Sequence, residues 1–271
     1  GYTQSTVSIQ IRQLEDEVGM PLFDRINHSV YLTEAGKQFL QHAMKFDHNM
    51  HDMVETLRNP ADPEGEIRMV SSDSICEKMM LLNYHEFYSF YPKIRLIFST
   101  TDTREMLNIL DRHEADVAFT LDTHVYREEY VIAHESKVPL HFFTNPQSEI
   151  AQKKNLAMTD VLEYPVLLTE KNLSYRRVLD SFLAERSLHI SPVLETGRTD
   201  ILANAVSRGN FVTFLPDFVT EDMVRAGKLV QLEPEGIEFS IWKQLIYRKD
   251  KWVSHSMRAF LDFVIAHEFK W

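Results

Sequence analysis

Hydroxyl side chains gather after several predicted strands, where open α/β sheets bind small molecules. Four short segments, 71–74, 99–102, 169 and 196–199, are rich in serine and threonine. Three of them lead directly into predicted helices, whose first backbone N–H groups are free to meet an anion. The pattern predicts a pocket for one small molecule, anionic in preference to cationic. Its candidate ligands are Ser72, Ser74, Thr100, Thr101, Thr169, Arg198 and Thr199.

The same segments also admit a plainer interpretation. Ser74, Asp102 and Thr199 would serve as ordinary helix caps, and Ser74 with Glu77 has the spacing of a capping box. Lysine and arginine are nearly absent from these loops. We therefore expect the anion to be held mainly by neutral donors, with Arg198 able to pair with a carboxylate.

The sequence shows no pattern typical of catalysis or of a metal site. No G-x-S-x-G, H-E-x-x-H, P-loop or G-x-G-x-x-G motif occurs. His48 and His51 lie three residues apart on a predicted helix, but no third ligand has a matching spacing. The single cysteine, Cys76, excludes an intramolecular disulfide and suits a reducing cytosol. We expect no catalytic residue, no metal, no cofactor and a cytoplasmic location.

Predicted strands and helices alternate from residue 66 onward. Strands at 67–70, 94–98 and 117–119 are separated by helices at 74–91 and 102–112, and the alternation continues to about residue 268. This order predicts an α/β fold with a parallel sheet and helices on its faces. The preceding segment, 59–66, holds two prolines and a glycine and is typical of a linker.

The first 58 residues have a different organisation. Thr3 and Gly19 fit the two caps of a helix that begins at Gln4, and a β-hairpin is expected over 22–32. A long helix is then predicted over 34–58. Its apolar side chains recur at alternating steps of four and three residues: Phe39, Ala43, Phe46, Met50, Met53 and Leu57. This heptad seam predicts dimerisation, and packing of the helix on its own domain is the alternative.

The N-terminal string resembles the winged helix-turn-helix of LysR-type transcriptional regulators. The matching stretches are 3–8, 11–15, Gly19, 21–25 and 32–36. The resemblance implies that the helix from Gln4 is the recognition helix, that residues 23–32 form the wing, and that part of the helix-turn-helix precedes residue 1.

Weaker landmarks follow in the order found in the LysR-type effector-binding domain, whose fold is similar to periplasmic solute-binding proteins. They are 65–67, 91–94, 116–118, Val206 with Gly209, and 214–216. The resemblance implies a partial winged helix-turn-helix at 1–33, a dimerising linker helix at 34–58 and an effector-binding domain at 66–271. It divides the last into lobe I, 67–137 and 240–271, and lobe II, 138–239, with the effector between them.

Contacts with promoter DNA are expected from the start of the first helix and from the wing. The candidates are Gln4, Ser5, Ser8, Ile9, Arg12 and Arg25. Hydroxyl groups and N–H groups at a helix start can meet phosphate, Arg12 can reach a phosphate or a guanine edge, and Ile9 can touch a thymine methyl. Residues 1–58 nevertheless hold five Lys or Arg against eight Asp or Glu, a net charge of −3, which is unusual for a DNA-binding module.

Composition limits the classes of function. The chain has 271 residues and a net charge of −11, which argues against coating nucleic acid by bulk charge. No apolar run reaches the length of a membrane span, so no membrane partner is expected. A solute-binding protein of the same two-lobed fold would leave the predicted heptad helix and wing unexplained, and an enzyme of that fold would need a catalytic constellation, which the sequence does not show. We predict an effector-responsive, DNA-binding regulator that forms a homodimer and, by resemblance, a tetramer.

Overall fold

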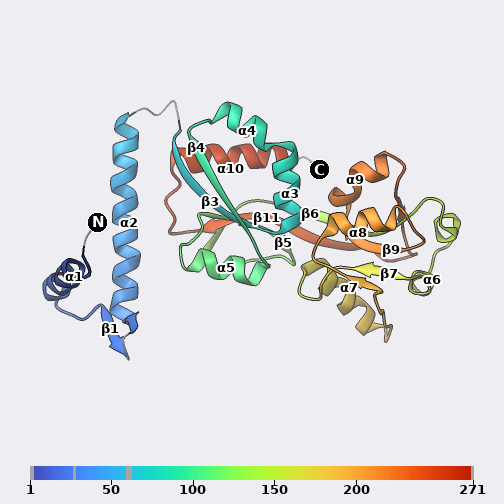
Figure 1. Cartoon of the computed structure of the whole chain (residues 1–271), viewed down its shortest axis with the longest axis horizontal. Helices are drawn as coiled ribbons and strands as arrows, with labels where there is room; N and C mark the ends of the chain where they lie inside the picture. The colour runs from blue at the N-terminus through green and yellow to red at the C-terminus, as the bar shows by residue number, and fades with distance from the viewer. Residues whose placement is uncertain (1–2, 27–28, 59–62, 270–271) are drawn as a thin grey trace. The chain divides into compact units, whose positions relative to one another are not determined.

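The computed structural model describes residues 3–26, 29–58 and 63–269, which fall into two compact units (Figure 1). The first unit comprises residues up to 61 together with 250–254, and the second comprises 62–249 and 255–271. Each unit has its own sheet and is considered by itself.

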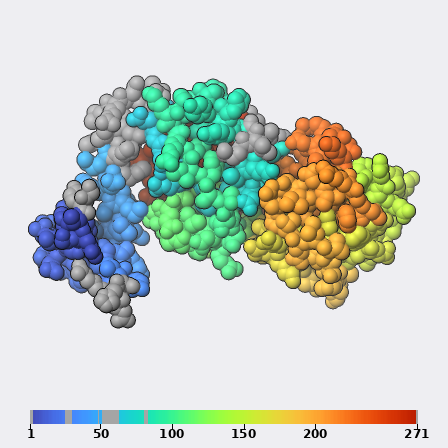
Figure 2. Space-filling view, viewed as in Figure 1, coloured from blue at the N-terminus to red at the C-terminus, as the bar shows by residue number. Residues whose placement is uncertain are grey.

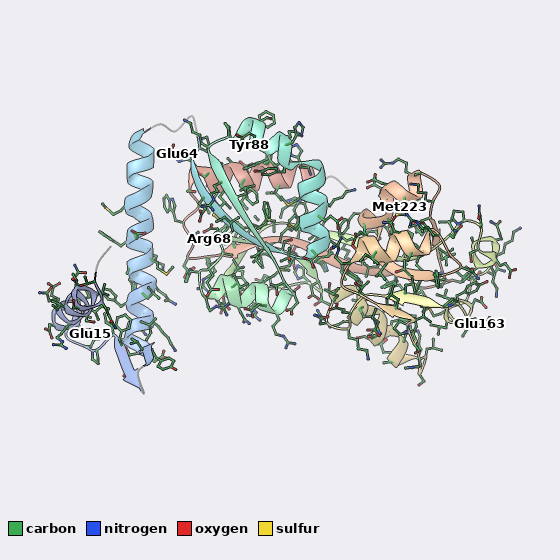
Figure 3. The ribbon with its side chains drawn as sticks, in the orientation of Figure 1. Glu15, Glu64, Arg68, Tyr88, Glu163 and Met223 are labelled. Carbon is green, nitrogen blue, oxygen red and sulfur yellow. The ribbon has the colours of Figure 1, made fainter. Side chains whose placement is uncertain are left out.

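The first unit begins with helix α1, Gln4–Val18. The Thr3 hydroxyl accepts a hydrogen bond from the N–H of Thr6, and Gly19 ends the helix in the left-handed conformation at φ 76°. Both caps are those predicted. Glu15 of α1, labelled in Figure 3, accepts hydrogen bonds from the N–H groups of Leu22 and Phe23 at 2.7 and 3.0 Å. These bonds fix the turn that leads to the hairpin.

The hairpin consists of β1, Phe23–Ile26, and β2, Ser29–Leu32, paired antiparallel. Its predicted turn at 27–28 lies outside the described residues. Helix α2, Glu34–Arg58, follows with the bounds expected from the sequence. Near its start a Cβ on Gly36 would lie 2.0 Å from the carbonyl oxygen of Leu22, so only glycine allows this approach of helix and loop.

The predicted seam of α2 is open in the single chain. Phe39 and Ala43 are half-buried, whereas Phe46 is 69% exposed and Met50 is 45% exposed. The side chains of Met53 and Leu57 lie outside the described residues. A seam that leaves its large apolar side chains in water suits a partner helix, and dimerisation through it remains a prediction.

In the second unit, nine of the described strands form one sheet in the order β4-β3-β5-β11-β6-β9-β7-β8, with β10 paired to β6. The central pair is β6, Tyr130–Thr144, and β11, Phe239–Arg248, which run antiparallel to each other. The outer strands are β3 Gly65–Ser71, β4 Ile94–Thr100, β5 Val117–Asp122, β7 Val166–Leu168, β8 Leu194–Glu195, β9 Val212–Pro216 and β10 Val230–Leu232. The sheet is therefore mixed, and it is parallel only on either side of the central pair.

Helices cover the sheet in two groups, one on each side of the central pair (Figure 1). We call β3, β4 and β5 with their helices the first half, and β7, β8 and β9 with theirs the second half. Helices of the first half are α3 Asp73–Leu82, α4 Tyr84–Phe90, α5 Thr103–Asp111 and α10 His255–Glu268. Those of the second half are η1 Glu149–Gln152, α6 Met158–Leu162, α7 Ser174–Glu185, α8 Thr199–Val206 and α9 Asp217–Arg225.

Three local expectations were wrong. The helix predicted at 74–91 is two helices that meet at Asn83, whose side-chain amide donates to Glu268 instead of facing solvent along one helix. The alternation of strands and helices predicts separate strands at 131–134 and 138–144, whereas residues 130–144 form one continuous strand, β6. Neither Ser74 nor Thr199 is a helix cap, because Ser72 and Arg198 hold those positions and both residues are buried in the first turn of their helices.

Every residue of β5 and of β9 is buried, so the strand ends are held on a rigid core. None of the described helices is both long and apolar enough to cross a lipid bilayer.

Candidate functional site

A pocket of about 440 Å³ opens where the strands of both halves end. The surfaces of the halves, cyan and green against yellow and orange, meet along a boundary in Figure 2. The first half lines the pocket with Ser72–Ser74, Thr101–Thr103, Met106, Leu121 and Asp122. The second half lines it with Glu170, 172–175, Arg177 and 196–198. This is the sheet edge at which the sequence predicts a ligand.

The structure brings four of the seven predicted ligand residues together. Ser72, Ser74, Thr101 and Arg198 all line the pocket. The other three, Thr100, Thr169 and Thr199, are outside its described lining.

Each of those three has another setting. Thr100 is exposed at the end of β4. Thr169 is buried, and its carbonyl accepts a hydrogen bond from the Arg176 guanidinium at 2.7 Å. Thr199 is buried in the first turn of α8. These three residues therefore lie at strand ends without lining the pocket, and the ligand role of the remaining four is a prediction.

An arginine that was not predicted reaches into the pocket. Nη2 of Arg177, on α7, lies 2.6 Å from each carboxylate oxygen of Asp122, and Nη1 donates to the carbonyl of Asn172 at 2.6 Å. The Asp122 side chain is 6% exposed, while that of Arg177 is 48% exposed. This charge-assisted pair ties α7 to the end of β5.

Arg177 lies outside the four hydroxyl-rich segments, in which lysine and arginine are nearly absent. It enters the pocket from the first turn of the following helix, three residues after Ser174. Including the first turn of each helix in the candidate set would have found it.

Carboxylates outnumber guanidinium groups in the described lining. Asp73, Asp102, Asp122 and Glu170 face Arg177 and Arg198, which gives 2 − 4 = −2. Arg198 is itself paired with Asp200 at 2.7 Å, and the hydrogen bond from Arg198 lowers the pKa of Asp200. Both arginines therefore already have carboxylate partners that a ligand would have to replace or join.

Some of these carboxylates hold the local structure. Asp102 accepts a hydrogen bond from the N–H of Glu105 at 3.1 Å, which is the predicted cap of α5. Glu170 accepts one from the N–H of Gly197 at 3.1 Å and so fixes the turn before α8.

Backbone N–H groups provide the positive counterpart. The N-cap residues of α3, α7 and α8 are Ser72, Leu173 and Arg198, and none of them makes a side-chain cap hydrogen bond in the described structure. All three residues line the pocket. Three helix starts without a side-chain cap therefore meet at one pocket, and backbone N–H groups at a helix start can donate to an anion.

The candidate DNA-reading residues lie on an open helix face. Gln4, Ser5, Ile9 and Arg12 are exposed, with Ile9 at 60%, and Ser8 is half-exposed. No acidic residue occupies the first turn of α1, which favours approach of a phosphate. Arg25 lies on β1, and its side chain is outside the described residues.

Comparison with known proteins decides the family. Residues 60–268 match the family described as LysR substrate binding domain, and residues 1–37 match the bacterial regulatory helix-turn-helix protein, lysR family. The chain belongs to the LysR family. A relative from Bacillus subtilis (strain 168), named uncharacterized HTH-type transcriptional regulator YwqM, is 28% identical over 96% of this chain and 89% of its own length.

Solved structures of LysR regulators share the fold. A full-length variant of OxyR from Pseudomonas aeruginosa matches with a TM-score of 0.70 and 15% identity, over 97% of this chain and 86% of that one. The effector-binding domain of QuiR in complex with shikimate matches with a TM-score of 0.60 and 16% identity, over 77% of this chain and 99% of that one. The chain is thus a LysR-type transcriptional regulator with a helix-turn-helix and a substrate-binding domain, in a family of regulators and not of enzymes.

Proposed function

We propose that this LysR regulator responds to a small molecule that carries an anionic group, bound in the pocket at the strand ends. The observation that carries the proposal is the convergence of three uncapped helix starts, those of α3, α7 and α8, on that pocket. An anion placed there gains hydrogen bonds from backbone N–H groups, and the protein gains partners for them.

Arg177 gives the anion a second point of attachment. Its guanidinium is half-exposed, so a ligand carboxylate can share it with Asp122 or replace Asp122. Ser72, Ser74 and Thr101 provide hydroxyl groups on the opposite wall. The effector-binding domain of QuiR, of similar fold, was solved with shikimate, which supports a carboxylate without naming the effector of this chain.

A thermal-shift series tests this proposal. The full chain is heated with a panel of small carboxylates and with inorganic phosphate and sulfate. A ligand that binds only the native state raises the unfolding temperature with its concentration. We expect at least one anion to do so, and the Arg177→Gln variant to lose most of the response. Arg186→Gln is a matched control, because Arg186 lies just after α7 and is 49% exposed against 48% for Arg177. Equal responses in all three proteins would contradict the proposal.

We also propose that Gln4, Ser5, Ser8, Ile9, Arg12 and Arg25 contact promoter DNA. The exposure of the α1 residues supports this role. If Arg12 contacts a phosphate, Arg12→Ala should weaken binding to all sequences and reduce the salt slope by about one; if it contacts a base, the loss should be confined to one position. Gln13→Ala, at an exposed neighbour, should change neither. Unchanged binding by Arg12→Ala would remove Arg12 from the set.

We further propose a cytoplasmic homodimer through the α2 seam and a tetramer through the two-lobed effector-binding domains. The open Phe46 and Met50 support the dimer. Phe46→Glu would place a charge in the helix interface and should reduce the mass measured by sedimentation. Lys45→Glu, at an exposed position off the seam, is the control. A Phe46→Glu protein that sediments like the parent would contradict the seam.

A further inference from the structure

A second hollow of about 450 Å³ lies in the second unit, and the described linings of the two hollows have no residue in common. It lies between helix α9, on which Met223 is labelled in Figure 3, and the central strands β6 and β11. Its volume is within the range of small-molecule sites. The residues that decide its chemistry are Lys137, Val138, Phe143, Phe218, Val224 and Lys243.

Lys243 is a buried cation in the wall of this hollow. Only 5% of its surface is exposed, and its ammonium donates to the backbone carbonyl of Glu268 and lies 4.9 Å from the ring centroid of Phe269. An ammonium has three N–H donors, and among the described residues Lys243 has this one acceptor. Burial lowers the pKa of Lys243 to about 8, against the opposing effect of the Glu268 carboxylate. A buried charge with unused donors is stabilised by an acceptor of opposite charge.

The other charged residues of the described lining are paired or lie on the opposite face of the sheet. Lys137 is paired across the strands with Trp242, and its ammonium lies 5.6 Å from the ring centroid of Trp242, so it lies on the sheet face opposite to Lys243. The two acidic residues of the described lining are already engaged, since Asp217 lies 2.6 Å from Nδ1 of His141 and Glu221 is paired with Arg225. Lys243, whose charge is opposed by the buried Glu268 carboxylate, is therefore the cation of this wall that has unused N–H donors.

The rest of the wall is mostly hydrocarbon. Phe143 and Val138 are buried side chains of β6, and Phe218 and Val224 face the hollow from α9. We propose that this hollow binds a small apolar acid, aliphatic or aromatic, with its carboxylate on Lys243 and its hydrocarbon part between α9 and β6.

Binding there would also act on the regulator's response. The lining takes Lys243 from β11 and 136–139 from β6, the two strands shared by both halves of the sheet. A ligand with different affinities for two arrangements of these strands shifts the balance between them. Binding of the acid does not depend on the proposed function, whereas this regulatory consequence rests on the proposed function.

Calorimetric titration of the full chain with benzoate and with hexanoate tests the site. At least one of these acids should bind, whereas the uncharged benzamide and hexanamide should not. Lys243→Met and Val224→Trp should each weaken binding by about tenfold or more, the first by removing the charge and the second by filling the apolar part. Lys249→Met, at the exposed position that follows β11, and Arg177→Gln, in the other pocket, should leave the affinity unchanged.

The variants separate the possible outcomes. If Lys243→Met does not fold, Val224→Trp still tests the site, because it keeps the buried ammonium. Failure of both acids to bind the parent chain, or equal binding to Lys243→Met, would overturn the proposal. Loss of binding in Arg177→Gln would also overturn it, because the acid would then occupy the first pocket. The thermal-shift series with Arg177→Gln tests the proposed function separately from this site.

Discussion

The two hollows of the second unit hold their cations in opposite ways. In the pocket at the strand ends, Arg177 and Arg198 are about half exposed or more and each is paired with a carboxylate of the chain. In the hollow beside α9, Lys243 is buried and its described acceptor is a single carbonyl. An exposed, paired cation adds little to stability and can exchange its partner, whereas a buried cation without a full set of acceptors opposes folding. The two hollows have comparable volumes but differ in how far their cations are exposed and paired.

The largest expected effect is the pH dependence contributed by Lys243. Its pKa is about 8 in the folded chain and about 10.4 in an unfolded one, so between these values the unfolded state binds more protons and stability rises with pH. Below pH 8 both states are charged and the cost of burial is fully present. Relative to Lys243→Met, the parent should gain about 2 kcal/mol in free energy of unfolding from pH 8 to pH 10.

Urea unfolding at pH 8, 9 and 10 measures this difference. Lys249→Met is the control, because it removes an exposed lysine just after β11. If the difference in free energy of unfolding between the parent and Lys243→Met were the same at all three pH values, Lys243 would not be desolvated as described. The two hollows would then not differ in how they hold their cations.

A smaller effect is expected from the Arg177–Asp122 pair. Asp122 is buried and Arg177 is half-exposed, so the pair should be worth about 1 kcal/mol after solvent screening. A double-mutant cycle with Asp122→Asn and Arg177→Gln, followed by urea unfolding, gives this coupling. A coupling free energy of zero would show that the contact between Arg177 and Asp122 does not contribute to the free energy of unfolding. Asp122→Asn should also raise the affinity for anions, since it releases Arg177.

The smallest effect is expected at Arg198 and Asp200. Both groups are open to solvent, at 61% and 33% exposure of their side chains, and such pairs often contribute nothing measurable. Asp200→Asn should leave the unfolding midpoint unchanged while it frees Arg198 for an anion in the pocket. A clear loss of stability in Asp200→Asn would show that the Arg198–Asp200 pair stabilises the fold, as is expected of Arg177–Asp122.

Elements with strong local signals could be predicted from the sequence. Thr3 and Gly19 predicted the two ends of α1, and the heptad spacing predicted α2. The edge of the sheet that carries the pocket also followed, because the ends of parallel strands are fixed by the alternation of strands and helices. The break at Asn83 could not be predicted, since it depends on Glu268, which is 185 residues away.

The cations of the two hollows were missed for different reasons. Arg177 was missed because its position in the pocket depends on its hydrogen bonds to Asp122, and these depend on how α7 packs on β5. Lys243 left a signal that was not used: it alternates with Ile241 and Leu245, which are buried residues of the same strand face. A lysine in the middle of such an alternation predicts a buried charge. Its lowered pKa and its place in a hollow still required the tertiary structure.

The continuity of β6 also has a consequence for how the chain unfolds. This single 15-residue strand pairs with β11 over its first part and with β9 over its last part, so each half of the sheet is completed by a strand that also belongs to the other. Neither half can lose its hydrogen-bonded ladder without exposing an edge of its neighbour. The second unit should therefore melt as one cooperative block, with the amides of β6 and β11 among the last to exchange their hydrogens with solvent.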